Sequence, residues 1–513
     1  MKEYLKKVLQ ARVYEVAKKT PLEKAQNLSR RFKNNIYLKR EDLQEVFSFK
    51  IRGAYNKMQN LTKEQLSRGV ITSSAGNHAQ GVALSALQLK TKATILMPIT
   101  TPIVKVNAVK ELKAEVILFG ENYDESYIEA QRLSKERELS FIHPFNDPEV
   151  IAGQGTIGVE LLSQLKDPPD AIYVAVGGGG LIAGISIYIK NLWPTTKIIG
   201  IEPEDADAMT RSLKEKKIIE LDNVGLFADG VAVKKVGKLT FDIAKQYVDK
   251  MITVNTDEIC AAIIDVFEDT RSILEPAGAL SIAGMKKDIA ESDYKNKNLV
   301  AIACGANMNF ERLRFVAERA ELGEYKEVMF AVEIPERPGS LVELCKLLKK
   351  RNLTEFSYRM SNSSSAQIFM GIEVKGITDK ENLINIFNNS HHKFIDITND
   401  ELSKNHLRHM VGGRLPSEIS KSKNEELIEL LYRFEFPERP GALMNFLKSM
   451  RPDWSISIFH YRNHGADVGR IVIGVLINKN GLKEWFDFLN VLGYKYWDES
   501  NNQTYKLFLG ASN

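Results

Sequence analysis

The chain has 513 residues, of which 44% are hydrophobic and 27% charged, as in an ordinary globular protein with about three domains. Its 70 basic and 66 acidic residues nearly cancel and form no long basic run, which excludes the charge pattern of a nucleic-acid-binding protein. No stretch of about 18 apolar residues occurs, so we expect no membrane span. Three scattered cysteines and no signal-peptide pattern predict a reduced, cytoplasmic protein without disulfides or zinc.

Strands and helices are predicted to alternate over the first three hundred residues. Residues 1–20 predict an amphipathic helix. Beyond them, apolar strands separated by segments of helical periodicity indicate parallel sheets covered on both faces, in which ligands bind at the carboxyl ends of strands. The predicted strands include Ala93–Met97, Glu115–Gly120, Ser140–Phe145, Ala171–Val176, Lys197–Pro203, Met251–Asn255 and Leu299–Gly305.

Lys50 lies between apolar neighbours in the stretch SFKIRGA, Ser48 to Ala54. Desolvation lowers the pKa of a lysine and lets its amine form a Schiff base with an aldehyde. On this stretch alone, a solvated lysine at the start of a helix is the more ordinary interpretation, because most lysines are exposed.

Two loops of small residues change that judgement. TSSAGNHAQG, Thr72 to Gly81, joins a short apolar strand to a helix and presents N–H groups at a helix N-terminus, although an N-cap turn is the commoner use of such residues. The loop Gly177–Gly180 has four glycines, which allow close approach to a phosphate, whereas a tight turn needs one or two. A reactive lysine with a phosphate loop indicates pyridoxal 5'-phosphate (PLP).

Five motifs in order, SFKIRGA, SSAGNHAQG, VGGGGL, LEPAGAL and CGANMNF, carry a resemblance that extends over nearly the whole chain. The sequence resembles the fold-type II PLP enzymes and, within them, the biosynthetic threonine deaminases (threonine ammonia-lyases). This resemblance implies an α/β catalytic region of the tryptophan synthase β-like fold with parallel sheets, followed by two ACT-like α+β domains.

The resemblance also implies roles for individual residues. Lys50 would hold PLP and, once freed, take the Cα proton of the substrate, while Asn77 would hydrogen-bond the ring hydroxyl of the cofactor. The substrate carboxylate would be gripped by Ser74, Ala75, Gly76, Asn77 and His78, with a buried structural histidine as an equal alternative for His78. The phosphate would be bound by Gly177, Gly178, Gly179, Gly180 and Leu181.

Cys304 would face the pyridine nitrogen, where the family often has Ser. A thiol is not an acid that protonates the ring, and a neutral ring is the weaker electron sink, which suits β-elimination better than transamination. A small buried core residue is the alternative interpretation of Cys304.

Two acidic positions remain open. Glu275 in LEPAGAL lies either near the pocket or at a helix cap. Glu202, Pro203 and Ala206 match a divalent-cation motif of some relatives, but Ala208 stands where the motif needs an Asp. We therefore predict no metal.

The last part of the chain contains an internal repeat. VEIPERPG at 332–339 returns as FEFPERPG at 434–441, with an offset of 435 − 333 = 102, and FSYR at 356–359 returns as FHYR at 459–462. The repeat resembles the ACT-like regulatory domains of threonine deaminases, and a plain structural repeat is the alternative. The predicted domains are a PLP-dependent catalytic domain at 1–322 and ACT-like domains at 323–415 and 416–513, with a helix and linker at about 398–426.

The resemblance predicts PLP-dependent deamination of L-threonine to 2-oxobutanoate and ammonia, with L-serine as a poorer substrate, at the first step of isoleucine biosynthesis. It implies L-isoleucine as inhibitor, L-valine as its antagonist, and a homotetramer. Tyr358 and Tyr461, at near-equivalent positions in the repeat, are candidates to line effector sites, and core aromatic residues are an equal alternative. Other candidate functions are serine racemisation, β-replacement, and a catalytically silent amino-acid sensor.

Overall fold

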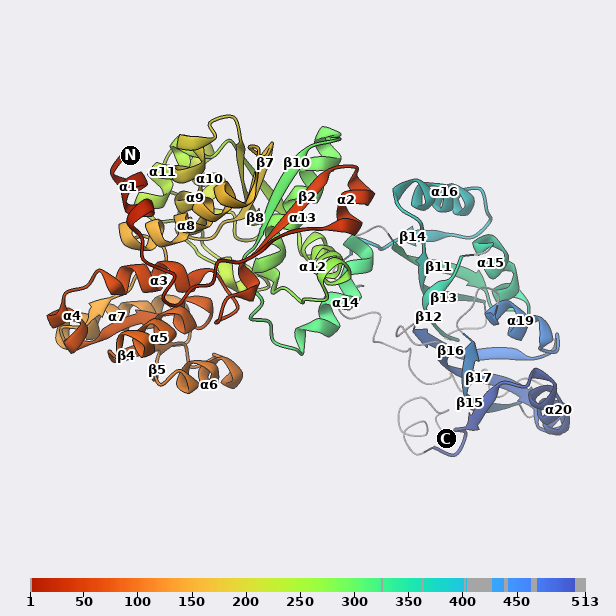
Figure 1. Cartoon of the computed structure of the whole chain (residues 1–513). Coiled ribbons are helices and arrows are strands. Elements are labelled where there is room, and N and C mark those ends of the chain that lie inside the picture. Colours follow the sequence, from red (N-terminus) through yellow and green to blue (C-terminus); the bar gives the residue numbers. More distant parts are fainter. Residues whose placement is uncertain are drawn as a thin grey trace. The chain divides into compact units, whose positions relative to one another are not determined.

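The computed structural model of this chain describes residues 2–323, 326–349, 351–360, 364–400, 403, 427–437, 442–462 and 468–502. The chain divides into two compact units, Met1–Gly323 and Glu324–Asn513 (Figure 1). Within the described ranges, no helix is both long and apolar enough to span a membrane.

The described part of the first unit contains two sheets. One runs in the order β1 (Leu22–Lys24), β2 (Asn35–Arg40), β10 (Asn298–Ala303), β7 (Ala171–Ala175), β8 (Lys197–Pro203) and β9 (Lys250–Val254), parallel except for the β1–β2 pair. The other is parallel throughout, in the order β5 (Glu115–Leu118), β4 (Ala93–Met97), β3 (Val70–Ser73) and β6 (Ser140–Phe141). Every residue of β4 and β7 is buried, as expected of parallel strands covered on both faces.

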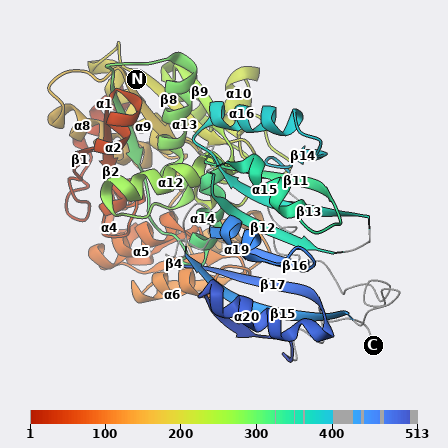
Figure 2. The same ribbon diagram turned by 90° about the vertical axis from the view of Figure 1, so that its right-hand side faces the viewer.

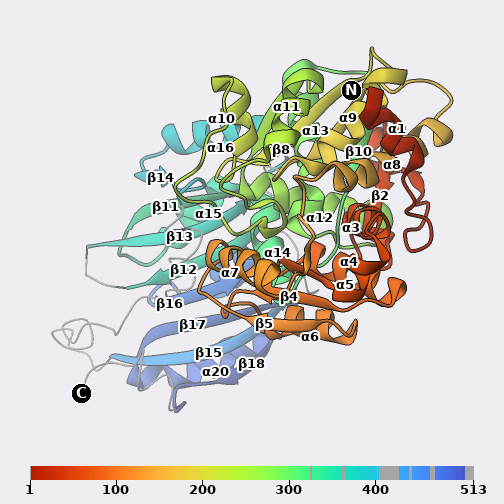
Figure 3. The same ribbon diagram turned by 90° about the vertical axis from the view of Figure 1, so that its left-hand side faces the viewer.

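Helices connect these strands, and α5, α6 and α7 pack around the smaller sheet (Figure 3). The helical segments are α1 (Lys2–Gln10), α2 (Gln26–Phe32), η1 (Glu41–Leu43), α3 (Lys50–Gln59), α4 (Lys63–Arg68), α5 (Asn77–Leu89), α6 (Ile103–Glu111), α7 (Tyr123–Glu136), α8 (Pro148–Gln164), α9 (Gly180–Leu192), α10 (Ala208–Glu215), η2 (Asp229–Val231), α11 (Lys238–Tyr247), α12 (Thr256–Thr270), α13 (Pro276–Ser292) and α14 (Arg312–Gly323).

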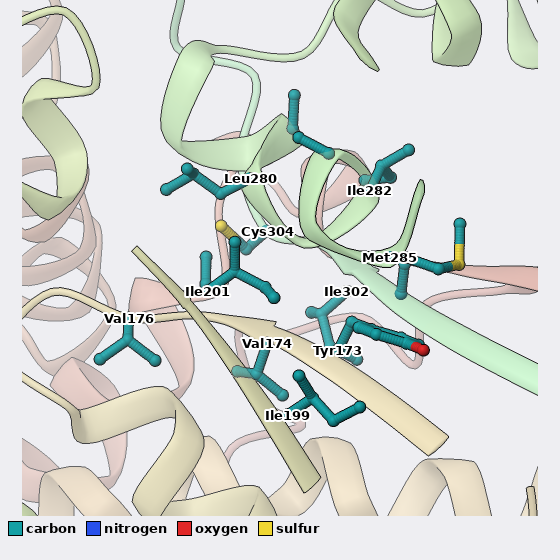
Figure 4. Close-up of a cluster of buried hydrophobic side chains, with 14 of the residues drawn as sticks. Tyr173, Val174, Val176, Ile199, Ile201, Leu280, Ile282, Met285, Ile302 and Cys304 are labelled. Atoms are coloured by element: carbon teal, nitrogen blue, oxygen red, sulfur yellow. The ribbon is translucent and has the colours of Figure 1, made fainter. Parts of the chain in front are cut away.

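The core of the larger sheet lies between its central strands and α13. Figure 4 shows Tyr173 and Ile201 on the side of the sheet that faces α13, and Val174 and Val176 on its other side. The labelled residues are Tyr173, Val174, Val176, Ile199, Ile201, Leu280, Ile282, Met285, Ile302 and Cys304. Because the strands are fixed in this core, the loops at their carboxyl ends begin from fixed points.

The N-terminal helix is shorter than predicted. It ends at Gln10 instead of continuing to residue 20. The backbone N–H groups of the following segment donate to side chains of other elements rather than to carbonyls of a continuing helix: Arg12 to Asn56, Lys18 to Gln44 and Thr20 to Glu160. The strand predicted at Ser140–Phe145 is likewise reduced to β6, because the chain turns at its end to approach Lys50.

The described part of the second unit is an antiparallel sheet with its helices on one face (Figures 1 and 2). The strand order is β14 (Phe394–Asp396), β11 (Glu327–Pro335), β13 (Ser365–Glu373), β12 (Leu353–Arg359), β16 (Ser455–Arg462), β17 (Val468–Asn478), β15 (Leu427–Pro437) and β18 (Lys495–Asp498). The helical segments are α15 (Ser340–Leu348), α16 (Ile377–Asn388), α19 (Ala442–Ser449), η4 (Lys479–Gly481) and α20 (Leu482–Leu492).

The sequence repeat corresponds to two copies of a β-α-β-β-α-β arrangement, β11 to β14 and β15 to β18. The copies share one sheet because β12 pairs antiparallel with β16, which places Phe356 opposite Tyr461 and Tyr358 opposite Phe459. The first PERPG turn leads into α15 through Gly339, whose φ of +91° favours glycine. In the second copy, residues 438–441 lie outside the described residues, as does most of 398–426. The predicted architecture, parallel sheets followed by two α+β repeats, is confirmed.

Candidate active site and effector pocket

Lys50 is the first residue of α3, and the segment before it is tied to the end of β10. The Phe49 N–H donates to the Cys304 carbonyl at 3.2 Å, and Ser48 forms an isolated bridge with Gly305. These bonds bring the lysine motif to the carboxyl edge of the larger sheet, beside the CGAN motif.

The Lys50 amine donates to the carbonyl of Pro144 at 3.1 Å. Burial lowers its pKa to about 8, against the opposing effect of nearby Cys304 and Glu275. The next residue, Phe145, fills the space beside the glycine loop: a Cβ on Gly178 would lie 2.3 Å from its ring. Lys50 and the tetraglycine loop therefore approach the same two-residue segment.

Asn77, the first residue of α5, is held at both ends of its amide. Its Nδ2 donates to Glu275 Oε1, and its Oδ1 accepts from Asn307 Nδ2 at 2.6 Å. Asn307 Nδ2 also donates to the Val46 carbonyl at 2.9 Å. Because the Val46 carbonyl can only accept, Asn307 presents its Nδ2, so Asn77 must present Oδ1 to Asn307 and Nδ2 to Glu275.

Glu275 immediately precedes α13 but makes no side-chain cap bond. Its buried carboxyl lies instead against Asn77 and Gly305, so the pocket interpretation of Glu275 is the one the geometry supports. Burial raises the pKa of Glu275 to about 7 from its ordinary value of 4.5.

The raised pKa of Glu275 predicts a pH-dependent loss of stability in the cofactor-free protein. The folded protein holds the Glu275 proton more tightly than the unfolded chain does. This proton binding contributes to the free energy of unfolding in full below pH 4.5, and the contribution is lost as the pH rises through 7. The difference, 7 − 4.5 = 2.5, corresponds to about 3 kcal/mol. We expect Glu275→Gln, which can still accept from Asn77, to gain stability relative to wild type across this window. Urea unfolding at several pH values measures this difference in the free energy of unfolding. If the free energies of the two proteins change with pH in parallel, the prediction is wrong.

The SSAGN loop begins where β3 ends. Ser74 N donates to the Leu96 carbonyl at 3.0 Å, and the Gly76 N–H donates to Ser74 Oγ at 3.3 Å. Residues 74–77 are half-buried, and a Cβ on Gly76 would meet no atom within 4 Å. The loop therefore borders open space at the N-terminus of α5.

His78 lies one residue further on and is buried. Its Nε2 donates to the Ile142 carbonyl at 2.9 Å, and burial lowers its pKa to about 3, so the imidazole is neutral. Nδ1 of His78 and the hydroxyls of Ser48 and Ser73 are buried without a hydrogen-bond partner among the described residues. A buried structural role for His78 explains the hydrogen bond of its Nε2. It does not explain why Nδ1 of His78 and the two serine hydroxyls have no partner among the described residues.

The tetraglycine loop follows β7 and opens α9, with Gly179 at φ +89°. A Cβ on Gly177 would lie 2.8 Å from Val231 Cα, and one on Gly179 would lie 2.9 Å from Thr240 Cβ. Close packing against neighbouring residues thus requires glycine at several positions of this loop. The sequence alone did not indicate this reason for the four glycines. The first N–H groups of α9, those of Gly180 and Leu181, lack intrahelical acceptors and suit an anion.

Cys304 is buried directly after β10, where Figure 4 shows it among the core side chains. Its thiol donates to the Ala277 carbonyl at 3.3 Å, and burial raises its pKa. Its carbonyl accepts from the N–H of Phe49, the residue before Lys50. Cys304 is therefore both a core residue and a neighbour of the lysine.

Sequence reasoning missed the residues that support these loops. Pro144 supplies the carbonyl for Lys50, and His143 Nδ1 accepts from the N–H groups of Phe145 and Asn146. Thr240 Oγ1 donates to the Gly178 carbonyl at 2.6 Å. The only signal was that HPF, residues 143–145, forms the end of the predicted strand Ser140–Phe145.

Glu202, the first residue of the incomplete cation motif, has a structural use. It accepts from the N–H groups of Met209 and Thr210, at 2.9 and 2.8 Å, at the start of α10. Among the described residues, no group of three or more His, Cys, Asp or Glu side chains could hold a metal ion.

PLP fits this set of residues. The desolvated Lys50, the buried Ser48 hydroxyl and the N-terminus of α9 lie at the carboxyl ends of β10 and β7 in the larger sheet. The buried Ser73 hydroxyl lies at the end of β3 in the smaller sheet, and the Asn77 amide that follows it is tied to the larger sheet through Glu275 and Asn307. These groups are the amine, anion site and hydrogen-bonding groups that an aldehyde with a phosphate and a ring hydroxyl needs.

A pocket of about 270 Å³ lies in the second unit, between the first PERPG turn and the end of α19 with the segment that follows it. Its lining comprises Ile334, Glu336, Arg337, Pro338, Gly339, Ser340, Leu341, Val342, Tyr358, Leu447, Lys448, Met450, Arg451, Pro452, Trp454, Ser455 and Ile456. The Tyr358 hydroxyl lies 2.7 Å from Glu336 Oε1, and burial raises the pKa of Glu336. Tyr461 lies on β16, opposite Phe356, and is not among the residues that line this pocket.

Comparisons with known proteins agree with this geometry. Residues 13–305 match the family described as "Pyridoxal-phosphate dependent enzyme", and residues 318–407 and 420–509 match "C-terminal regulatory domain of Threonine dehydratase". A Burkholderia multivorans protein, "L-threonine dehydratase biosynthetic IlvA", is 53% identical over 99% of both chains.

Two solved structures resemble the catalytic part. The processed form of threonine deaminase isoform 2 from Solanum lycopersicum is 52% identical, with a TM-score of 0.61 over 62% of this chain and 88% of its own. Serine racemase from Dictyostelium discoideum is 35% identical, with a TM-score of 0.56 over 60% of this chain and 99% of its own. The chain therefore belongs to the pyridoxal-phosphate dependent enzymes, and within them to the biosynthetic threonine dehydratases that carry a C-terminal regulatory region.

Proposed function

We propose that this enzyme deaminates L-threonine to 2-oxobutanoate and ammonia and that Lys50 carries its PLP. The observation that carries the proposal is the contact of the Lys50 amine with Pro144, next to the Phe145 ring that packs on the glycine loop. One bound ring can thus reach the amine with its aldehyde and the N-terminus of α9 with its phosphate.

The protein residues have separable tasks in this proposal. PLP, when bound, stabilises the negative charge left at Cα by loss of a proton. Lys50, with a pKa of about 8, is neutral in an appreciable fraction of molecules near neutral pH and can take that proton. Asn77 donates to the ring hydroxyl, and the loop of Ser74, Ala75, Gly76, Asn77 and His78 holds the substrate carboxylate at the N-terminus of α5.

Cys304 faces the ring nitrogen in this proposal and keeps it unprotonated. We expect Cys304→Ser to retain most threonine turnover, because a hydroxyl can also donate to Ala277 and does not protonate the ring. Cys304→Asp should lower turnover and divert the substrate to side products, since a carboxylate there would protonate the ring. Product analysis by chromatography tests this, and equal product ratios from wild type and the Asp variant would count against the placement.

Serine racemisation is the competing reaction, because the Dictyostelium discoideum serine racemase shares the catalytic fold. The regulatory region supports deamination, since its matched family is described for threonine dehydratase. The test is an assay of PLP-loaded enzyme with L-threonine and L-serine for 2-oxo acid and D-serine. D-serine as the main product, or no visible absorption band of bound cofactor, would sink the proposal.

We propose further that the chain comprises a catalytic domain at 1–322 and ACT-like domains at 323–415 and 416–513, inhibited by L-isoleucine with L-valine as antagonist. The pocket beside the first PERPG turn supports this. The N-terminus of α15 and the buried Ser340 hydroxyl, which has no partner among the described residues, suit a carboxylate. Glu336 suits an ammonium group, and Leu447 and Trp454 suit an aliphatic side chain. A homotetramer remains a prediction, measurable by sedimentation.

A further inference from the structure

A network of buried charges lies behind the helix that begins with Lys50. Its members are Lys39 of β2, Glu41 of η1, Arg52 of α3 and Glu160 of α8, whose side chains are at most 1% exposed. Two cations balance two carboxylates. The catalytic proposal assigns no task to any of them.

Arg52 uses every N–H of its guanidinium. Nε and Nη2 donate to the two oxygens of Glu41, both at 2.8 Å, and Nη1 donates to Glu160 Oε1 at 2.7 Å. Nη1 also donates to Thr156 Oγ1, and Nη2 also donates to the Lys18 carbonyl, both at 3.1 Å. A planar fork with all donors engaged has one position, so Arg52 fixes the helix that bears it.

Lys50 and Arg52 leave α3 on opposite sides. Residues two positions apart in a helix point about 200° apart around its axis. Arg52 therefore faces the charge network, while Lys50 faces Pro144. The N-cap residue Phe49 makes no side-chain cap bond. The backbones of α3 and α8 also touch, since a Cβ on Gly153 would lie 2.5 Å from the Arg52 carbonyl.

Stability alone is a weak reason for such a network, because apolar replacements of buried ion pairs are often as stable. We propose that Arg52 is a positioning residue for Lys50: it holds the first turn of α3 so that the amine stays at the cofactor site. The inference rests on the proposed role of Lys50.

The test compares two buried cations of the same network. Arg52→Met removes the one on the helix of Lys50, and Lys39→Met, the matched control, removes the one on β2. Each PLP-loaded protein is reduced with borohydride, which fixes the cofactor to the lysine that carries it, and peptide mapping gives the labelled fraction of Lys50. For each protein, thermal melting gives the melting temperature, and steady-state kinetics with threonine give kcat and KM.

We expect Arg52→Met to lose about 90% of the label at Lys50 and about 100-fold in kcat, the cost of a misplacement near 1 Å, with little change in KM. Lys39→Met should melt at a similarly lowered temperature yet keep the label. If Arg52→Met does not fold, Arg52→Lys decides, because it keeps the charge without the fork and should lose label partially.

Three results would overturn the inference, and they are distinguishable. Equal labelling of Lys50 in wild type and the folded Arg52 variant, or parallel losses in Arg52→Met and Lys39→Met, would make Arg52 merely stabilising. Labelling of another lysine in wild type would overturn the role of Lys50 and, with it, this inference.

Discussion

Replacing Lys50 with alanine is expected to abolish threonine turnover, by more than about 10³-fold, while the fold is retained. The side chain donates one hydrogen bond, to the Pro144 carbonyl, and belongs to none of the buried ion pairs described above. Its loss removes a desolvated amine rather than a structural support, so the melting temperature should not fall.

The measurement is the visible spectrum of the PLP-loaded variant together with a 2-oxo acid assay. The matched control is Lys57→Ala, on the same helix, which removes an ion pair with Asp147 at 2.7 Å and does not touch the site. Lys57→Ala should keep the cofactor band and the turnover. Wild-type turnover by Lys50→Ala would mean that another lysine carries the cofactor.

Local patterns sufficed to predict the elements that carry this site. Continuous apolar runs marked the strands, and β4 and β8 have the predicted bounds. Three of the motif loops, SSAGN, VGGGGL and CGAN, follow β3, β7 and β10 directly, as the rule for parallel sheets requires, whereas LEPAGAL lies between α12 and α13. The repeat at an offset of about 100 residues corresponds to the two copies in the antiparallel sheet.

Pairings between distant residues could not be predicted in this way. Glu275 and Asn77 are 198 residues apart, and no local pattern distinguishes a helix cap from this contact. The ties of Arg52 to Glu41 and Glu160 depend on how α3 packs on α8. The same holds for the pairing of β12 with β16, because the FSYR and FHYR repeat marks these two strands without indicating that they pair with each other.

The tetraglycine loop has a packing role that the sequence did not indicate. Four glycines suggested a phosphate, but Val231, Phe145 and Thr240 each occupy space that a side chain in the loop would need. The sequence contains these neighbours without indicating that they meet there. The phosphate interpretation therefore rests on the start of α9 more than on the glycine count.

Ending the chain after Gly323 is expected to leave threonine turnover measurable and to remove inhibition by isoleucine. The compact first unit ends at this residue and contains every proposed catalytic group. The second unit contains the pocket of Glu336, Ser340 and Tyr358. For allosteric inhibition, isoleucine must bind the less active state more tightly, with a coupling of about 1–3 kcal/mol, or roughly 5- to 150-fold in affinity.

A full-length variant separates loss of the pocket from loss of the domain. Glu336→Gln removes the charge that would pair with the effector ammonium but keeps an acceptor for the Tyr358 hydroxyl. It should retain basal turnover and require about tenfold more isoleucine for half-inhibition, as expected from losing about 1.4 kcal/mol of binding. Glu333→Gln, which removes the pair of Glu333 with Lys393 outside the pocket lining, is the control and should leave inhibition unchanged. An active truncated enzyme that isoleucine still inhibits would place the effector site in the first unit, because no other part of the chain would remain to bind it.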